Sequence, residues 1–249
     1  YEALLRVFRR WSGPVEIERI DVGHLRGYLR YLRTEHVPYG EGHPLHRADR
    51  RLSPHSIRGY WATLSAFFGW AMREGILETN PMRRIPMPRV PRKAKVGFTG
   101  EEVKRLLEAS AAKGARRAAR DRAIILFLLD TGCRVSELCN CRLGDLDMAS
   151  GRVRVRGKGA RERFVYIGRT TKRAIRKYVR EHRPGPRAGV GDYLFLTYDG
   201  RKLTRSGIAN MLSRLGKAAG VPRVHAHRFR HTAAVEYLRH RPEANRAEA

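Results

Sequence analysis

A run of prolines and cations in the first half of the chain limits what the polypeptide can fold into. Residues 80–97 (NPMRRIPMPRVPRKAKVG) contain four prolines and six Lys or Arg residues. Proline disfavours a helix interior and a central strand, because its ring fixes the backbone and removes an N–H donor. The segment predicts a basic, extended linker over 83–98 that separates one domain at 1–82 from another at 99–249.

The part of the chain before the linker has the periodicity of helices throughout. Apolar residues recur at helical spacing in residues 1–11 and again after Asp21. Ser53-Pro54 has the pattern of an N-cap followed by proline at the first helical position, and the helix it opens ends near Gly75. This half is predicted to be an all-helical domain.

Beyond the linker, helical patterns flank one hairpin pattern. Thr99 and Glu102 form a capping-box pattern, and a later apolar helix over 117–130 stops at Thr131-Gly132. Two segments of alternating apolar and polar residues predict a β-hairpin around Lys158. The remaining predicted elements are helices over 170–182, 205–219 and 228–239 and a short strand at 194–196. The fold class predicted is mainly α with a small β-hairpin or sheet, in two domains.

The net charge indicates a polyanionic partner. The chain has 52 Lys and Arg against 24 Asp and Glu, a formal charge of +28, and an isoelectric point of about 11.2. A magnitude of roughly 2–8 is enough to keep a small domain soluble. A larger excess repels itself in the folded state, so it favours a nucleic-acid partner. No apolar run approaches the ~18 residues that span a bilayer, so no membrane partner is expected.

The three cysteines do not predict a metal site. Cys133, Cys139 and Cys141 have a C-x5-C-x-C spacing, which fits neither zinc ligation nor a C-x-x-C redox pair. They are interpreted as reduced thiols of an intracellular protein. No Asp or Glu pair with metal-ligand spacing is evident either, which argues against a two-metal nuclease.

Three short stretches of the second half carry candidate chemistry: TGCRVSEL (131–138), RGKGARER (156–163) and VHAHRFRHTAA (224–234). Two arginines can hold the oxygens of a phosphodiester, and a lysine or histidine can protonate a leaving oxygen. Taken singly, each stretch also has a structural interpretation, such as an Arg–Glu ion pair or a structural histidine. Together, in a strongly basic chain, they favour phosphoryl transfer without a metal. The candidate residues are Arg134, Glu137, Lys158, His227, Arg230 and His231.

In this order, the three stretches resemble the motifs of the tyrosine recombinase family, which includes phage integrases and Xer-like proteins. TGCRVSEL resembles the T-G-x-R-x-S-E-L box, RGKGARER the hairpin of the catalytic lysine, and HRFRHTAA the H-x-L-R-H-x-x-A box. The resemblance covers most of the chain. It implies a helical core-binding, SAM-like DNA-binding domain at 1–82 and an α+β catalytic domain at 99–249.

The resemblance also implies residue roles. Arg134 and Arg230 would be the catalytic arginines, Lys158 the catalytic lysine and His227 the general acid/base, supported by Glu137 and His231. The expected contributors to DNA binding are Arg58, Arg83, Arg84, Arg89, Arg92, Lys93 and Lys95.

The implied activity is site-specific DNA recombination or integration. A tyrosine hydroxyl attacks the scissile phosphate and leaves a 3′-phosphotyrosyl link and a free 5′ hydroxyl, and a second 5′ hydroxyl reverses the attack. The covalent link conserves the energy of the bond, so no cofactor is expected. The implied partners are double-stranded DNA and, for the full-length protein, a homotetramer on two DNA sites. The implied location is the prokaryotic cytoplasm, in association with the nucleoid.

The sequence departs from the family pattern after Arg230. The family continues with a G-H box and then the nucleophilic tyrosine, whereas the 19 residues after Arg230 contain no G-H box. Tyr237 is interpreted as a core residue. We therefore expect a chain truncated before its nucleophile. A DNA-binding protein without catalysis and a type IB topoisomerase remain as alternatives.

Overall fold

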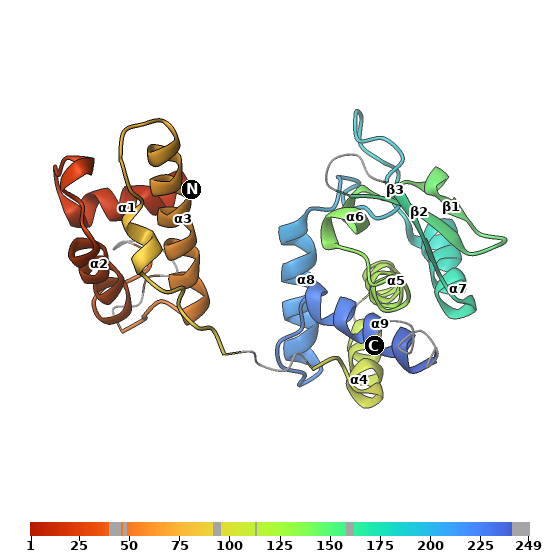
Figure 1. Ribbon diagram of the computed structural model, residues 1–249. Helices are drawn as coiled ribbons and strands as arrows, with labels where there is room; N and C mark the ends of the chain where they lie inside the picture. Colours follow the sequence, from red (N-terminus) through yellow and green to blue (C-terminus); the bar gives the residue numbers. More distant parts are fainter. Residues whose placement is uncertain (40–45, 47–48, 92–95, 113, 158–161, 241–249) are drawn as a thin grey trace. The chain divides into compact units, whose positions relative to one another are not determined.

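The computed structural model describes residues 1–39, 46, 49–91, 96–112, 114–157 and 162–240 (Figure 1). It divides the chain into two compact units, Tyr1–Lys93 and Ala94–Ala249. The first is helical and the second combines helices with a small antiparallel sheet, so the predicted fold class is confirmed. In the described ranges, no helix is both long enough and apolar enough to cross a membrane.

The helices of the first unit begin where the sequence predicts. The Asp21 carboxylate accepts the N–H of His24 at 2.7 Å, and Ser53 Oγ accepts the N–H of Ser56 at 3.1 Å. Both caps satisfy a backbone donor that has no partner within the helix. The elements are α1 (Glu2–Ser12), η1 (Ile17–Arg19), α2 (Val22–Thr34), α3 (Pro54–Arg73) and η2 (Pro81–Arg84).

Both ends of the segment predicted as the linker, 83–98, belong to the two units. Arg83 and Arg84 lie in the 3-10 helix η2 rather than in an extended chain, and Ile85 is buried in the core of the first unit. Trp61 Nε1 donates to the Ile85 carbonyl at 3.1 Å. At the other end, Phe98 is buried in the core of the second unit. Burial of Ile85 and Phe98 anchors the two ends of the segment, whereas residues 86–91, which hold three prolines, form neither helix nor strand.

The second unit is built around a central helix. Helix α5 (Ala115–Thr131) buries residues 123–128 and contacts α4, α7, α9 and strand β3 (Figure 1). Its apolar sequence, with no polar face over those residues, suits this position. The helices around it are α4 (Gly100–Ala111), α6 (Val135–Asn140), α7 (Arg169–Lys177), α8 (Arg205–Ala218) and α9 (Ala226–His240), with 3-10 helix η3 (Leu143–Asp145) and π-helix η5 (Tyr178–His182).

The sheet of the second unit has three antiparallel strands in the order β1 (Leu146–Asp147), β2 (Arg152–Arg156) and β3 (Glu162–Tyr166). Val153 pairs with Val165 and Arg154 with Phe164, so the predicted hairpin is confirmed. The predicted strand at 194–196 is wrong. These residues are buried, but Leu196 pairs with Lys202 and the preceding Tyr193 with Arg142 only in isolated antiparallel bridges, one position each.

Candidate catalytic site

Arg134 lies at a sharp turn between α5 and α6. Gly132 ends α5 in the left-handed region, at φ 53°, and its N–H donates to the Leu128 carbonyl at 3.0 Å. Arg134 is the N-cap residue of α6 and has an extended backbone, so it precedes the first turn of that helix. Its side chain is 60% exposed. The turn therefore presents a guanidinium to solvent from a fixed backbone.

The Glu137 carboxylate holds that turn by hydrogen bonds to Arg134. Its side chain is fully buried, and its Oε2 accepts the backbone N–H of Arg134 at 2.7 Å while its Oε1 accepts Arg134 Nη1 at 3.2 Å. Burial alone would raise the pKa of Glu137. The hydrogen bonds from Arg163 and from the Arg134 backbone outweigh burial and lower the pKa to about 2. Glu137 is thus an ionised carboxylate that orients Arg134 by two contacts.

Arg163 is a site residue that the sequence reasoning missed. From strand β3, its Nη1 and Nη2 donate to Glu137 Oε1 and Oε2 at 2.6 and 2.8 Å. This bidentate pair joins the loop end of the hairpin to α6. A signal was available, because strand alternation places Arg163 on the same face as the partly buried Val165. A cation on a core-facing strand position needs an acidic partner.

Arg230 is brought to the same turn by helix α9. Its Nη1 donates to the Gly132 carbonyl at 3.1 Å, two residues before Arg134. A Cβ at Gly132 would lie 3.0 Å from Ala233 Cβ, so α9 packs directly on the turn. The structure therefore brings together the two predicted arginines, which are 96 positions apart in the sequence.

The two histidines lie on the same helix. The His227 and His231 rings are 4.6 Å apart, centroid to centroid, at an interplanar angle of 78°. His227 is exposed and His231 half-buried, in the first turns of α9 with Arg230 between them. Residues three and four apart share a helix face, so His227, Arg230 and His231 project to the same side.

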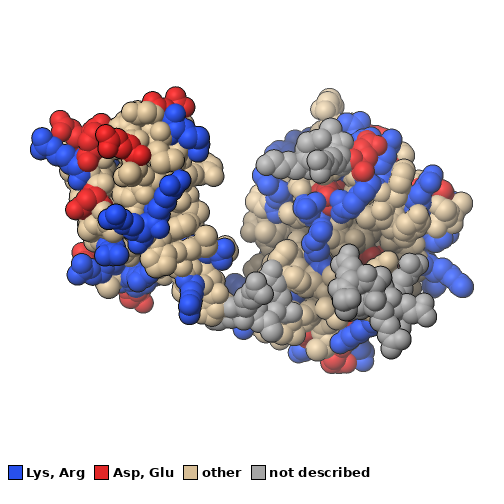
Figure 2. Space-filling model, viewed as in Figure 1, with Lys and Arg blue, Asp and Glu red and all other residues tan. Residues whose placement is uncertain are grey.

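Some predicted site residues are not described. Lys158 lies outside the described residues, although the two strands that flank it are held by the Arg156–Glu162 ion pair at 2.8 Å. Among the predicted DNA contacts, Arg58, Arg83 and Arg84 are exposed on the first unit. Arg92, Lys93 and Lys95 lie outside the described residues. Figure 2 shows Lys and Arg side chains over both units on the face it presents.

The described cysteines and carboxylates do not support a thiol nucleophile or a metal site. Cys133, Cys139 and Cys141 are buried and unpaired with one another, and burial raises the pKa of Cys133 to about 11. A thiol with so high a pKa stays protonated at neutral pH and is a poor nucleophile. Among the described residues, no group of three or more His, Cys, Asp or Glu side chains could hold a metal ion.

The interpretation of Tyr237 as a core residue is wrong, since 58% of it is exposed. Thr232 is the last buried residue in the described part of α9, and residues 234–239 are exposed. Tyr237 lies seven residues beyond Arg230, about 10 Å along the helix axis.

Comparisons with known proteins agree with this geometry. Residues 97–246 match the model of the phage integrase family, and residues 1–87 match that of the phage integrase SAM-like domain. The tyrosine recombinase XerD of Listeria monocytogenes is 31% identical over 241 residues, which are 96% of this chain and 75% of that protein. The tyrosine recombinase XerC of Staphylococcus carnosus is 32% identical over 225 residues, 90% of this chain and 70% of the relative.

Solved structures give the same fold. The XerH site-specific recombinase, in a complex with a palindromic difH substrate, superposes with a TM-score of 0.74 at 21% identity. The match covers 98% of this chain and 69% of that one. The XerA recombinase has a TM-score of 0.52 at 26% identity, with 96% and 76% of the two chains covered.

Proposed function

Because this chain belongs to the phage integrase family, we propose that it is a site-specific DNA recombinase that cuts and rejoins strands through a 3′-phosphotyrosyl intermediate. Its relatives XerD and XerC are tyrosine recombinases. The observation that carries the proposal is the meeting of Arg134 and Arg230 at the Gly132 turn. One guanidinium is oriented by a buried carboxylate and the other is anchored on a backbone carbonyl.

In the proposed mechanism, the two arginines act on the charge of the reacting phosphate. Arg134 and Arg230 each donate to non-bridging oxygens, whose negative charge grows in the five-coordinate transition state. Because Glu137 and Gly132 hold the guanidinium groups before DNA binds, little reorganisation is needed during the reaction. In this proposal, neither strand cleavage nor strand rejoining requires a metal or another cofactor.

Proton transfer is assigned to the remaining candidates. His227, exposed on the first turn of α9, would act as general acid/base at the attacking hydroxyl. Lys158 would protonate the leaving 5′ oxygen, and His231 would support His227 through their ring contact. We do not assign the nucleophile to Tyr237, because it lies about two helical turns from Arg230.

The proposed partner is double-stranded DNA, bound by both units, with a homotetramer assembling on two DNA sites. The net charge of +28 supports this partner. Exposed Arg58, Arg83 and Arg84 are proposed contacts of the first unit. Contacts to phosphates supply affinity without sequence information, so these residues are expected to position the duplex rather than read it.

The test is a suicide-substrate assay with the protein carried through to the end of its native reading frame. A nicked recombination site should trap a covalent protein–DNA adduct, and Arg134→Ala or Arg230→Ala should abolish it. Arg201→Ala is the matched control, because it removes an exposed, Asp199-paired arginine of the same unit.

Other outcomes separate the alternatives. DNA binding without an adduct would contradict the proposal and favour a DNA-binding protein that lacks catalysis. Relaxation of supercoiled DNA by single protomers would favour a type IB topoisomerase. An adduct that forms at full yield in both arginine variants would refute the assigned site.

A further inference from the structure

Arg228 is an arginine inside the HRFRH stretch that the proposed mechanism leaves without a role. It lies between His227 and Phe229, yet its side chain is only 13% exposed. Successive helical residues are rotated by about 100°, so Arg228 and Arg230 lie on nearly opposite faces of α9. Arg228 therefore points away from the proposed phosphate site and into the unit.

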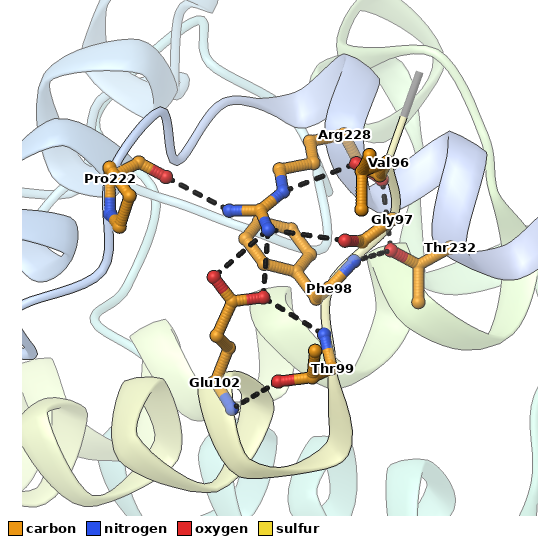
Figure 3. A network of polar contacts seen from close by, with 8 residues as sticks. All are labelled: Val96, Gly97, Phe98, Thr99, Glu102, Pro222, Arg228 and Thr232. Carbon is orange, nitrogen blue, oxygen red and sulfur yellow. Dashed lines mark hydrogen bonds and ion pairs between the residues drawn. The ribbon is translucent and has the colours of Figure 1, made fainter. Parts of the chain in front are cut away.

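The guanidinium of Arg228 is surrounded by acceptors from three other segments (Figure 3). Its Nη2 donates to both carboxylate oxygens of Glu102, at 2.9 and 2.7 Å, and to the Gly97 carbonyl at 3.1 Å. Its Nη1 donates to the Pro222 carbonyl at 2.9 Å, and Nε donates to the Val96 carbonyl at 3.4 Å.

Two of these acceptors belong to the segment by which the chain enters the second unit. Residues 96–98 lie along α9, and the Phe98 N–H donates to Thr232 Oγ1 at 2.8 Å. A Cβ on Gly97 would come within 3.2 Å of the Thr232 Cα, so the backbones approach closely. The Arg228 guanidinium also lies over the Phe98 ring, 4.1 Å from its centroid.

Glu102 connects the same arginine to the start of α4. Its Oε2 accepts the Thr99 N–H at 2.9 Å, while Thr99 Oγ1 accepts the Glu102 N–H at 3.1 Å. One carboxylate thus caps α4 and pairs with Arg228 on α9. The entry segment, α4 and α9 are joined at a single partly buried ion pair, which is worth more than an exposed one because few waters compete for it.

We propose that Arg228 is a positioning residue for the DNA-cleavage reaction: it locks α9 to the entry segment 96–98 and so holds His227 and Arg230 in place. The inference rests on the proposed function. Because the turns that carry His227 and Arg230 are the turns that hold residues 96–98, a shift of the entry segment moves the catalytic side chains. A displacement of about 1 Å in such groups costs about 100-fold in rate.

The test compares Arg228→Lys, Arg228→Gln and Thr232→Val with wild type and with Arg239→Gln. Lysine keeps the charge and the pairing with Glu102 but cannot reach the carbonyls of 96, 97 and 222 together. Thr232→Val removes the Phe98 acceptor without touching Arg228. Arg239→Gln, on the same helix, removes an exposed arginine paired with Glu236 as the matched control.

Three quantities are measured well below the melting temperature of every variant: the first-order rate of adduct formation at saturating DNA, the Kd for DNA, and hydrogen exchange at the Phe98 amide. We expect the rate to fall 10–100-fold in the two Arg228 variants and in Thr232→Val. The Kd should change less than twofold, and Phe98 exchange should accelerate at least tenfold. Arg239→Gln should match wild type.

The inference is overturned if the Arg228 variants cleave at the wild-type rate while Phe98 exchange accelerates, because the contact would then be only structural. It is also overturned if Phe98 exchange is unchanged, since the lock would then not depend on Arg228. Absence of an adduct from the wild-type protein would refute the proposed function instead. Hydrogen exchange at the Phe98 amide would still decide whether Arg228 holds the entry segment.

Discussion

Replacing Arg163 with methionine should show how much of the stability of the second unit depends on pairing the buried Glu137 carboxylate. Arg163 gives Glu137 two hydrogen bonds, at 2.6 and 2.8 Å, and the Glu137 side chain is fully buried. Methionine retains similar length but offers no donor, so the carboxylate would be left with Arg134 alone. Removing one partner of a buried ion pair costs about 3–5 kcal/mol. Because Arg134 remains and the Arg163 side chain is 39% exposed, we expect the free energy of unfolding of the second unit to fall by about 2–3 kcal/mol, at or below the low end of that range.

The pKa of Glu137 sets the pH dependence of this stability. Its contacts hold the pKa at about 2, against an ordinary value of 4.5. At 1.36 kcal/mol per pH unit, that difference corresponds to about 3 kcal/mol at neutral pH for all the contacts of Glu137 together, of which those with Arg163 are one part. Since the folded-state pKa is the lower one, this stability is fully present above about pH 4.5 and is lost as the pH falls toward 2.

The distribution of tryptophan makes the measurement specific. Trp11, Trp61 and Trp70 all lie in the first unit, and the second unit has no tryptophan. In urea at pH 7, Arg163→Met should move the circular-dichroism transition of the second unit and leave the tryptophan-fluorescence transition unchanged. Arg173→Met, which removes an exposed arginine of α7, is the matched control.

A double variant distinguishes the buried charge from lost packing. Glu137→Gln combined with Arg163→Met should be more stable than Arg163→Met alone, because glutamine removes the unpaired charge. A loss below about 1 kcal/mol for Arg163→Met, or a double variant no better than the single one, would refute the reasoning.

Three other outcomes are expected. DNA affinity should fall steeply between low and moderate salt, because a protein that contacts 6–10 phosphates loses about 10³–10⁵ in affinity between 50 and 200 mM salt; a flat response in a filter-binding titration would contradict the phosphate contacts. Gly132→Ala should cost at least about 1–2 kcal/mol in urea unfolding of the second unit, since φ is 53° and the new Cβ would meet Ala233, whereas Gly144→Ala, with open space around it, is the control. Cys133 should react with a thiol reagent in the folded protein far more slowly than after unfolding in urea, because burial raises its pKa to about 11; equal rates would show that the thiol is accessible.

Local chemistry in the sequence determined where most helices begin. Ser53 and the Thr99–Glu102 pair cap helices as their residue types predict, because such caps need only neighbouring backbone donors. The period-two alternation of RVRVR likewise predicted β2, and three short motifs supplied the candidate site residues. These features depend on residues close together in the chain, so one sequence suffices to find them.

The tertiary structure alone decided the contacts between distant residues. Arg163 pairs with Glu137 across 26 positions and Arg228 with Glu102 across 126. The residues around Arg163 and Arg228 in the sequence do not indicate which carboxylate each arginine contacts, because these pairs depend on which residues lie close together after folding. The same reason explains the shortened linker. Its prolines and cations predicted an extended chain over 83–98, but Ile85 and Phe98 are buried in the two cores, which form only when each unit folds.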